Sequence, residues 1–166
     1  MKWFESWFNS KYYHILYKKR DYSEAALFID NILKSFQPPK NTKFLDLGCG
    51  SGRHSVYLNQ KGFYVDGMDL SKKSLDYAKK HENDQLKFYL KDMRKFKINE
   101  KYDFVLNLFT SFGYFEDDND NKNVFKNISQ SLKPKGHLII DFLNAEKVVN
   151  EFINNETKKI NDITFN

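Results

Sequence analysis

A turn rich in glycine, Gly48 to Gly52, carries the residues of this chain that are best suited to bind a ligand. It follows an apolar run, residues 44–47, that predicts a buried strand, and a helical pattern resumes near Arg53. Glycines at alternate positions let the backbone turn sharply and let a ligand lie against the main chain. The helix that follows opens with unpaired N–H groups, which favour a carboxylate or a phosphate. We therefore predict a nucleotide-type binding turn; the alternative is a bend without a ligand.

The spacing of the glycines, and an acid before them, indicate which nucleotide this is. Gly48, Gly50 and Gly52 follow the pattern G-x-G-x-G, whereas the dinucleotide fingerprint is G-x-G-x-x-G. Asp46 stands near the end of the strand, and a buried carboxylate is costly unless it meets a cation or a hydrogen-bond donor. The α-ammonium group of S-adenosylmethionine (SAM) is such a cation. SAM is therefore the expected ligand, and an NAD-type oxidoreductase is the disfavoured alternative.

Two further acids are predicted to end neighbouring strands. Asp69 ends the strand at 63–69, where a carboxylate can accept hydrogen bonds from a ribose diol. Ser71 is available to cap the next helix, so Asp69 is not needed for that purpose. Asp92 follows the strand at 86–90 and is expected to accept from the adenine amine, while Met93 covers the adenine ring. Adenosine is thus predicted to lie across three strand ends, beside Asp46, Asp69 and Asp92.

Strands and helices alternate along the rest of the chain, which predicts a mostly parallel sheet between two layers of helices. The first 20 residues are rich in aromatic side chains at helical spacing. They predict either a helix packed on the body or a lid over the cofactor, with Tyr13, Tyr17 and Arg20 reaching inward. Further strands are expected at 102–109 and 137–142, with a turn at 133–136 between them. Helices are expected at 71–80 and 145–153, with another between the last two strands whose buried face is Val124, Phe125, Ile128 and Leu132. Residues 158–165 are expected to start one more strand.

The run from Leu45 to Gly52 resembles motif I of the class I SAM-dependent methyltransferases. The segments 52–55, 92–94 and 107–114 are similar to a small-molecule branch that includes sugar N,N-dimethyltransferases. This resemblance implies a doubly wound, Rossmann-like sheet of about five to six strands with helices on both faces, in one domain spanning 1–166. The family's sheet normally has seven strands, so the last strands are expected to be missing. SAM binding without turnover is the corresponding alternative. The expected cofactor set is Tyr13, Tyr17, Arg20, Asp46, Gly48, Cys49, Gly50, Gly52, Arg53, Asp69, Leu70, Asp92, Met93, Asn107 and Phe109.

The resemblance implies in-line displacement at the sulfonium methyl group, for which the protein chiefly supplies position and exclusion of water. Tyr114 is expected to line the acceptor pocket. His14, Tyr114 and His54 are candidate bases, but none is assigned. Enzymes that methylate base amines or glutamine carry prolines after the fourth strand, which Asn107 to Thr110 lacks. The expected acceptor is therefore a small molecule with an amine, hydroxyl or carboxyl group.

Composition sets the remaining bounds. The 166 residues carry a formal charge of +5, and the lysines are scattered, which favours a solvated surface over a nucleic-acid partner. Cys49 is the single cysteine, so no disulfide framework is expected and a reducing cytoplasm is favoured. No apolar run approaches the roughly 18 residues of a membrane span. No metal site and no membrane partner are predicted.

Overall fold

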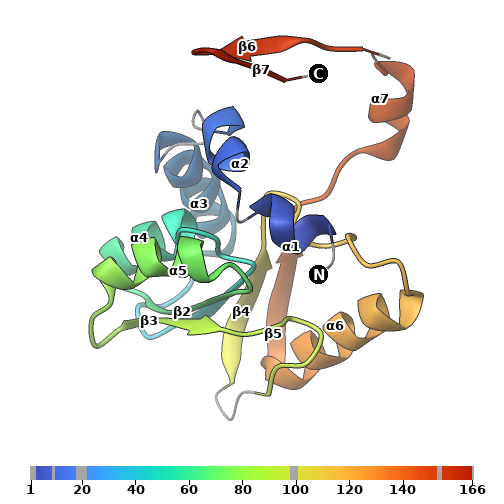
Figure 1. The fold of residues 1–166 in the computed structure, drawn as a ribbon. Helices are drawn as coiled ribbons and strands as arrows, with labels where there is room; N and C mark the ends of the chain where they lie inside the picture. The colour runs from blue at the N-terminus through green and yellow to red at the C-terminus, as the bar shows by residue number, and fades with distance from the viewer. Residues whose placement is uncertain (1–2, 9, 18–21, 98–100, 153–154, 166) are drawn as a thin grey trace.

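The computed structural model describes residues 3–8, 10–17, 22–97, 101–152 and 155–165 (Figure 1). Its centre is a five-stranded parallel sheet in the order β3-β2-β1-β4-β5. The strands are β1 (Lys43–Leu47), β2 (Tyr64–Asp69), β3 (Leu86–Leu90), β4 (Tyr102–Asn107) and β5 (Leu132–Ile140). The chain builds outward from β1 to β3, then crosses back to place β4 on the other side of β1. In such sheets the ligand lies beyond the carboxyl ends of the strands, where this reversal occurs. The predicted doubly wound architecture is confirmed.

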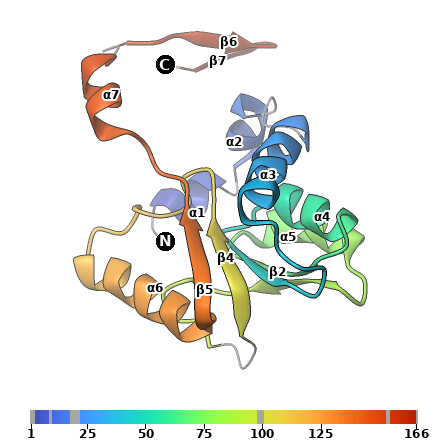
Figure 2. The ribbon, with the colours of Figure 1, turned by 180° about the vertical axis from the view of Figure 1, so that it is seen from behind.

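Helices cover both faces of the sheet (Figures 1 and 2). The helices α3 (Tyr22–Phe36), α4 (Arg53–Gln60) and α5 (Lys72–Ala78) pack on one face, and α6 (Asp118–Ser131) packs on the other. Period-two alternation in the strands explains both layers: Phe44 and Phe104 face the first group, whereas Leu45 and Val105 face α6. The two cores fix the carboxyl ends of the strands relative to one another.

The remaining elements lie outside this body. The short helices α1 (Trp3–Phe8) and α2 (Lys11–Leu16) come before α3, and the short helix η1 (Lys79–His81) extends α5. Ser10 separates α1 from α2, and its hydroxyl accepts a hydrogen bond from the Tyr13 amide at 3.1 Å. The helix α7 (Ala145–Asn150) and the antiparallel hairpin of β6 (Lys158–Ile160) and β7 (Ile163–Phe165) stand apart from the main sheet in both views. No helix in the described ranges is long and apolar enough to cross a membrane.

The structure differs from the predicted elements at three places. The turn expected at 133–136 lies inside β5, which starts at Leu132 and pairs with β4 through a shift of register next to Tyr102. Strand β4 ends at Asn107 and not at Phe109, because Phe109 and Thr110 turn into the left-handed region. Residues 158–165 form a separate hairpin and not a sixth strand of the sheet. In α6, Val124 and Ile128 are buried as expected, but Phe125 is 44% exposed.

Candidate cofactor site at the glycine turn

The glycine turn joins β1 to α4 in a conformation that needs residues without side chains at two positions. The amides of Gly48 and Cys49 both donate to the carbonyl oxygen of Met68, at 2.8 and 3.1 Å, which holds the turn against β2. A Cβ atom on Gly48 would lie 2.5 Å from that of Ser111. One on Gly52, where φ is +82°, would lie 2.8 Å from the ring of Phe88. The turn is therefore pressed between neighbouring elements.

Asp69 binds across this turn from the end of β2. Its Oδ2 accepts from the Gly50 amide at 2.8 Å, and its Oδ1 accepts from the Ser71 amide at 2.7 Å. Burial raises the pKa of Asp69, and these amide hydrogen bonds oppose the rise. Ser71 caps α5, since its hydroxyl accepts from the Ser74 amide at 3.2 Å. The carboxylate is thus held in one orientation, as predicted from its place at the strand end.

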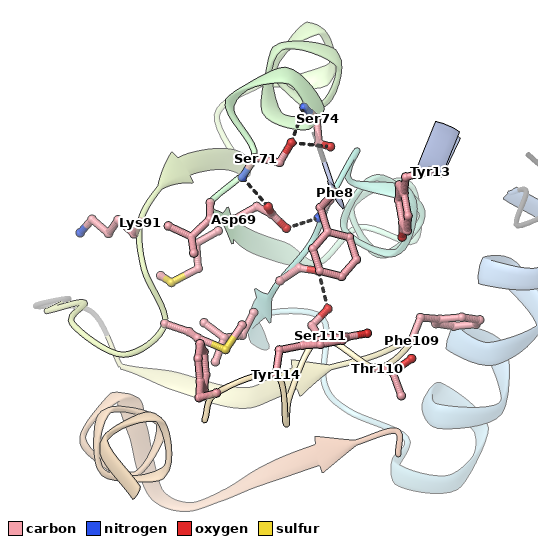
Figure 3. A pocket seen from close by; sticks show the side chains of 17 residues that line it. Phe8, Tyr13, Asp69, Ser71, Ser74, Lys91, Phe109, Thr110, Ser111 and Tyr114 are labelled. Carbon is pink, nitrogen blue, oxygen red and sulfur yellow. Dashed lines mark hydrogen bonds between the residues drawn. The ribbon is translucent and has the colours of Figure 1, made fainter. Parts of the chain in front are cut away.

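A cavity of about 880 Å³, partly open to solvent, lies beside Asp69 and over the turn (Figure 3). Residues from the ends of β1 and β2, from the segments after β3 and β4, and from α1 and α2 form its wall. The wall is formed by Phe8, Tyr13, Leu47, Gly48, Gly50, Met68, Asp69, Leu70, Ser71, Ser74, Lys91, Met93, Phe109, Thr110, Ser111, Tyr114 and Phe115. Apolar side chains and a few fixed polar groups together are typical of a small-molecule site.

A second, more polar cavity opens on the other side of the same turn. It shares Gly48, Gly50 and Phe109 with the first cavity and adds Arg53 and Tyr17 to its wall. The Arg53 guanidinium lies 5.3 Å from the centre of the Phe109 ring. A cation beside exposed glycine amides suits the carboxylate of a ligand.

His54 also lines the second cavity, and burial decides its chemistry. The side chain is 5% exposed and stacks on Phe109 with ring centres 4.9 Å apart. Burial, with a smaller effect of Arg53, lowers the pKa of His54 to about 3. Its Nε2 has no hydrogen-bond partner among the described residues. His54 is therefore neutral near pH 7 and too weak a base to remove a proton from an acceptor.

The aromatic N-terminal residues reach this site from the outside. The ring of Phe8 lies 5.0 Å from that of Tyr13 and 5.4 Å from that of Tyr114, both edge to face. Trp3 contacts Tyr114 in the same way at 5.6 Å. Phe8 and Tyr13 belong to the wall of the first cavity, so α1 and α2 close one side of it (Figure 3). Both readings of the aromatic segment, packed helix and lid, fit this arrangement.

Asp46 is buried beneath the turn. It is 1% exposed, and its Oδ2 accepts from the Ser55 hydroxyl at 2.6 Å. Burial raises the pKa of Asp46 to about 6; nearby Asp69 adds to the rise, while Ser55 and Arg53 oppose it. Asp46 belongs to the wall of neither cavity. It can therefore act on a ligand through its charge and through the turn, but it has no open face toward the ligand.

Known proteins share this sequence and fold. Residues 44–136 match the model of a family described as a methyltransferase domain. The chain belongs to the methyltransferase domain family. An N,N-dimethyltransferase of dTDP-3-amino-3,4,6-trideoxy-alpha-D-glucopyranose from Streptomyces venezuelae is 26% identical over 74% of this chain and 51% of its own length. A ubiquinone biosynthesis O-methyltransferase from Pelagibacter ubique is 36% identical over 69% of this chain and 50% of its own.

Solved structures agree with this assignment. An S-adenosylmethionine-dependent methyltransferase from Clostridium acetobutylicum superposes with a TM-score of 0.70 at 26% identity, over 89% of this chain and 60% of that one. The predicted resemblance to class I SAM-dependent methyltransferases of the small-molecule branch is confirmed. The chain spans about half the length of the curated relatives it matches.

Within this methyltransferase domain, Asp92 departs from its expected place. Its two carboxylate oxygens accept from the Arg94 guanidinium at 2.6 to 3.0 Å, and Arg94 also donates to Asp120 of α6 at 2.8 Å. Burial raises the pKa of Asp92, but the hydrogen bonds from Arg94 outweigh it and hold that pKa below its usual value. Asp92 does not line the cavity, whereas its neighbours Lys91 and Met93 do. The sequence places an acid here, but an ion pair with residues 26 positions apart occupies it.

The other predicted residues divide into two groups. Ten of them line the cavities: Tyr13, Tyr17, Gly48, Cys49, Gly50, Arg53, Leu70, Met93, Phe109 and Tyr114. Gly52 and Asn107 do not: Gly52 packs against Phe88, and the Asn107 amide nitrogen donates to the carbonyl oxygen of Leu47 at 2.6 Å. Arg20 and the side chain of His14 lie outside the described residues.

Several lining residues were not predicted as site residues. Thr110 and Ser111 follow β4, and the Ser111 hydroxyl donates to the carbonyl oxygen of Gly48 at 3.2 Å. Their place after a strand was the signal that could have found them. Ser74 and Phe8 carried no such signal, because a helix cap and an aromatic helix face have structural uses as well.

Proposed function

We propose that this chain binds SAM across the glycine turn and transfers the methyl group of SAM to a small-molecule acceptor. The observation that carries the proposal is the Asp69 carboxylate, which two backbone amides orient at the wall of the cavity. Each of its oxygens keeps a lone pair, so a ribose diol can donate to both. Membership of the methyltransferase domain family and a SAM-dependent relative of the same fold support this choice of ligand.

The two cavities divide the proposed cofactor between them. Asp69, Leu70 and Met93 would hold the adenosine in the first cavity. Arg53 would pair with the cofactor carboxylate in the second, and the charge of Asp46 would favour the ammonium group. Tyr13 and Tyr17 would close over both from α2 and the residue after it. We propose that residues 1–166 form a single cofactor-binding domain in which the first 20 residues are a lid.

When bound, SAM supplies an electrophilic methyl group on a sulfonium centre. The residues of this chain hold the reactants in line and exclude water, which by itself supplies a large part of such rate enhancements. Phe8, Tyr13 and Tyr114 form the apolar side of the cavity where an acceptor would lie. The Tyr114 ring is proposed to contact the acceptor. No base is needed for an amine that arrives neutral, and His54 is too weakly basic to serve as one.

The acceptor is proposed to be a small molecule with an amine, hydroxyl or carboxyl group. The amino-sugar N,N-dimethyltransferase among the relatives favours an amine, and the O-methyltransferase favours a hydroxyl. SAM binding without turnover is not favoured, since these relatives are named for methyl transfer. The free, buried Cys49 is the observation behind a proposed cytoplasmic location.

The test is a thermal-unfolding and calorimetry series with S-adenosylhomocysteine, NADH and ATP. A ligand at 100 times its Kd stabilises the folded state by about 2.7 kcal/mol, which is a shift of roughly 5–10 °C in Tm for a domain of this size. We expect that shift with S-adenosylhomocysteine alone. Stabilisation by NADH instead would revive the oxidoreductase alternative.

Asp69→Ala tests the residue that carries the proposal. It should weaken S-adenosylhomocysteine binding by roughly 10-fold or more, because two hydrogen bonds to a charged group are lost. Asp76→Ala removes an acid from an exposed helix face and is the matched control. Equal affinity in Asp69→Ala and the control would refute the site. A panel of small amines, alcohols and carboxylic acids, monitored by release of S-adenosylhomocysteine, then tests turnover separately from binding.

A further inference from the structure

Two successive residues after β4 hold a backbone conformation that residues with side chains rarely adopt. Phe109 has a φ of 56° and Thr110 a φ of 60°. In this left-handed region the Cβ atom crowds the following carbonyl oxygen, so the surroundings must stabilise it. Such conformations occur most often at binding sites. Both residues line the first cavity (Figure 3).

Asp141, the first residue after β5, stabilises this bend from both sides. Its Oδ2 accepts a hydrogen bond from the Phe109 amide at 3.1 Å. Its own amide donates to the carbonyl oxygen of Asn107 at 3.0 Å. The two bonds join the ends of β4 and β5 and enclose the residue at which the chain turns. Asp141 lines neither cavity, so any effect on the site passes through Phe109.

Phe109 in turn supports the wall of the second cavity. Its ring stacks on His54 at 4.9 Å with 27° between the planes, and it lies under the Arg53 guanidinium at 5.3 Å. Phe28 of α3 contacts the same ring at 5.6 Å. A Phe109 that left the left-handed region would withdraw its ring from both His54 and Arg53.

We propose that Asp141 is a positioning residue: it holds Phe109 and Thr110 in the left-handed bend and thereby fixes Arg53 at the wall of the second cavity. The ligand of that cavity, the amino-acid end of SAM, rests on the proposed function. The hydrogen-bonded bend does not, and the two parts can be tested separately.

Asp141→Ala and Asp141→Asn provide the test, because asparagine keeps an oxygen that can accept from the Phe109 amide. In the free protein, the Phe109 amide should exchange its hydrogen at least ~10-fold faster in Asp141→Ala than in the wild type. In Asp141→Asn the exchange rate should stay within ~3-fold of the wild type. Thermal unfolding of both variants checks that each is folded. Unchanged exchange in Asp141→Ala, or equal exchange in the two variants, would overturn the proposal.

Calorimetry with two ligands separates positioning from general loss of structure. S-adenosylhomocysteine carries the amino-acid end, whereas 5′-methylthioadenosine carries adenosine and a methylated sulfur without it. Asp141→Ala should weaken S-adenosylhomocysteine by ~10-fold and 5′-methylthioadenosine by less than ~3-fold. Equal weakening of both ligands would mean a merely structural role and would overturn the positioning assignment. Failure of the wild type to bind either ligand would refute the proposed function, and the exchange measurement would still decide whether Asp141 holds the bend.

Discussion

Replacing Asp46 by asparagine should make the protein more stable at neutral pH, because the fold resists ionisation of this carboxyl group. The side chain is 1% exposed, and burial with the nearby Asp69 raises its pKa from 3.8 to about 6. Between these two pH values the folded protein holds a proton that the unfolded chain has released. The stabilising contribution of protonated Asp46 is therefore complete below about pH 4 and is lost as the pH rises through about 6.

The magnitude follows from the size of the shift. One pKa unit corresponds to about 1.4 kcal/mol, so a shift of about two units lowers the free energy of unfolding by about 3 kcal/mol at pH 7. Asparagine has nearly the same shape and stays neutral, and its oxygen can still accept from Ser55. Asp46→Asn should thus match the wild type at pH 4 and exceed it by up to about 3 kcal/mol at pH 7.

Urea unfolding of the wild type and of Asp46→Asn, repeated from pH 4 to pH 8, measures this difference directly. Asp76→Asn removes the same charge from an exposed position and should change stability by less than about 0.5 kcal/mol. Parallel stability curves for the wild type and Asp46→Asn, or a less stable variant at pH 7, would refute the reasoning. A more stable variant that also binds S-adenosylhomocysteine more weakly would show why an acid is kept here.

Two other perturbations test the packing around the site. Arg94→Met removes the cation that joins Asp92 to Asp120, and because the Arg94 side chain is 12% exposed we expect a loss of about 2–4 kcal/mol in urea unfolding; a loss below about 0.5 kcal/mol, as for an exposed pair, would contradict it. Gly52→Ala should lose about 3 kcal/mol, because its Cβ would meet a ring at 2.8 Å. Gly50→Ala, with no atom within 4 Å, should lose only about 1 kcal/mol but bind S-adenosylhomocysteine at least ~10-fold more weakly; the reverse ranking would show that the two glycines were assigned the wrong roles.

Local patterns along the chain predicted most of the elements that build the site. The strand before the glycine turn, the helix after it and the acid at the end of β2 are set by apolar periodicity, by glycine spacing and by helix capping. Each of these signals acts over a few residues. Strand β3 was predicted with its observed bounds for the same reason. The start of β5 was missed, because its pairing with β4 across a register shift overrides the local turn signal at 133–136.

The sequence by itself determined where the chain bends around a ligand and that Asp69 stands at that bend, because neighbouring residues decide both. It could not determine what Asp92 meets, since the charges that share Arg94 come from segments far apart along the chain. Nor could it show that Phe109 and Thr110 turn left-handed, because the stabilising acceptor, Asp141, lies 32 residues away on another strand. Only the tertiary structure brings such groups together, and each of them then changes the conformation or the availability of the residue that it meets.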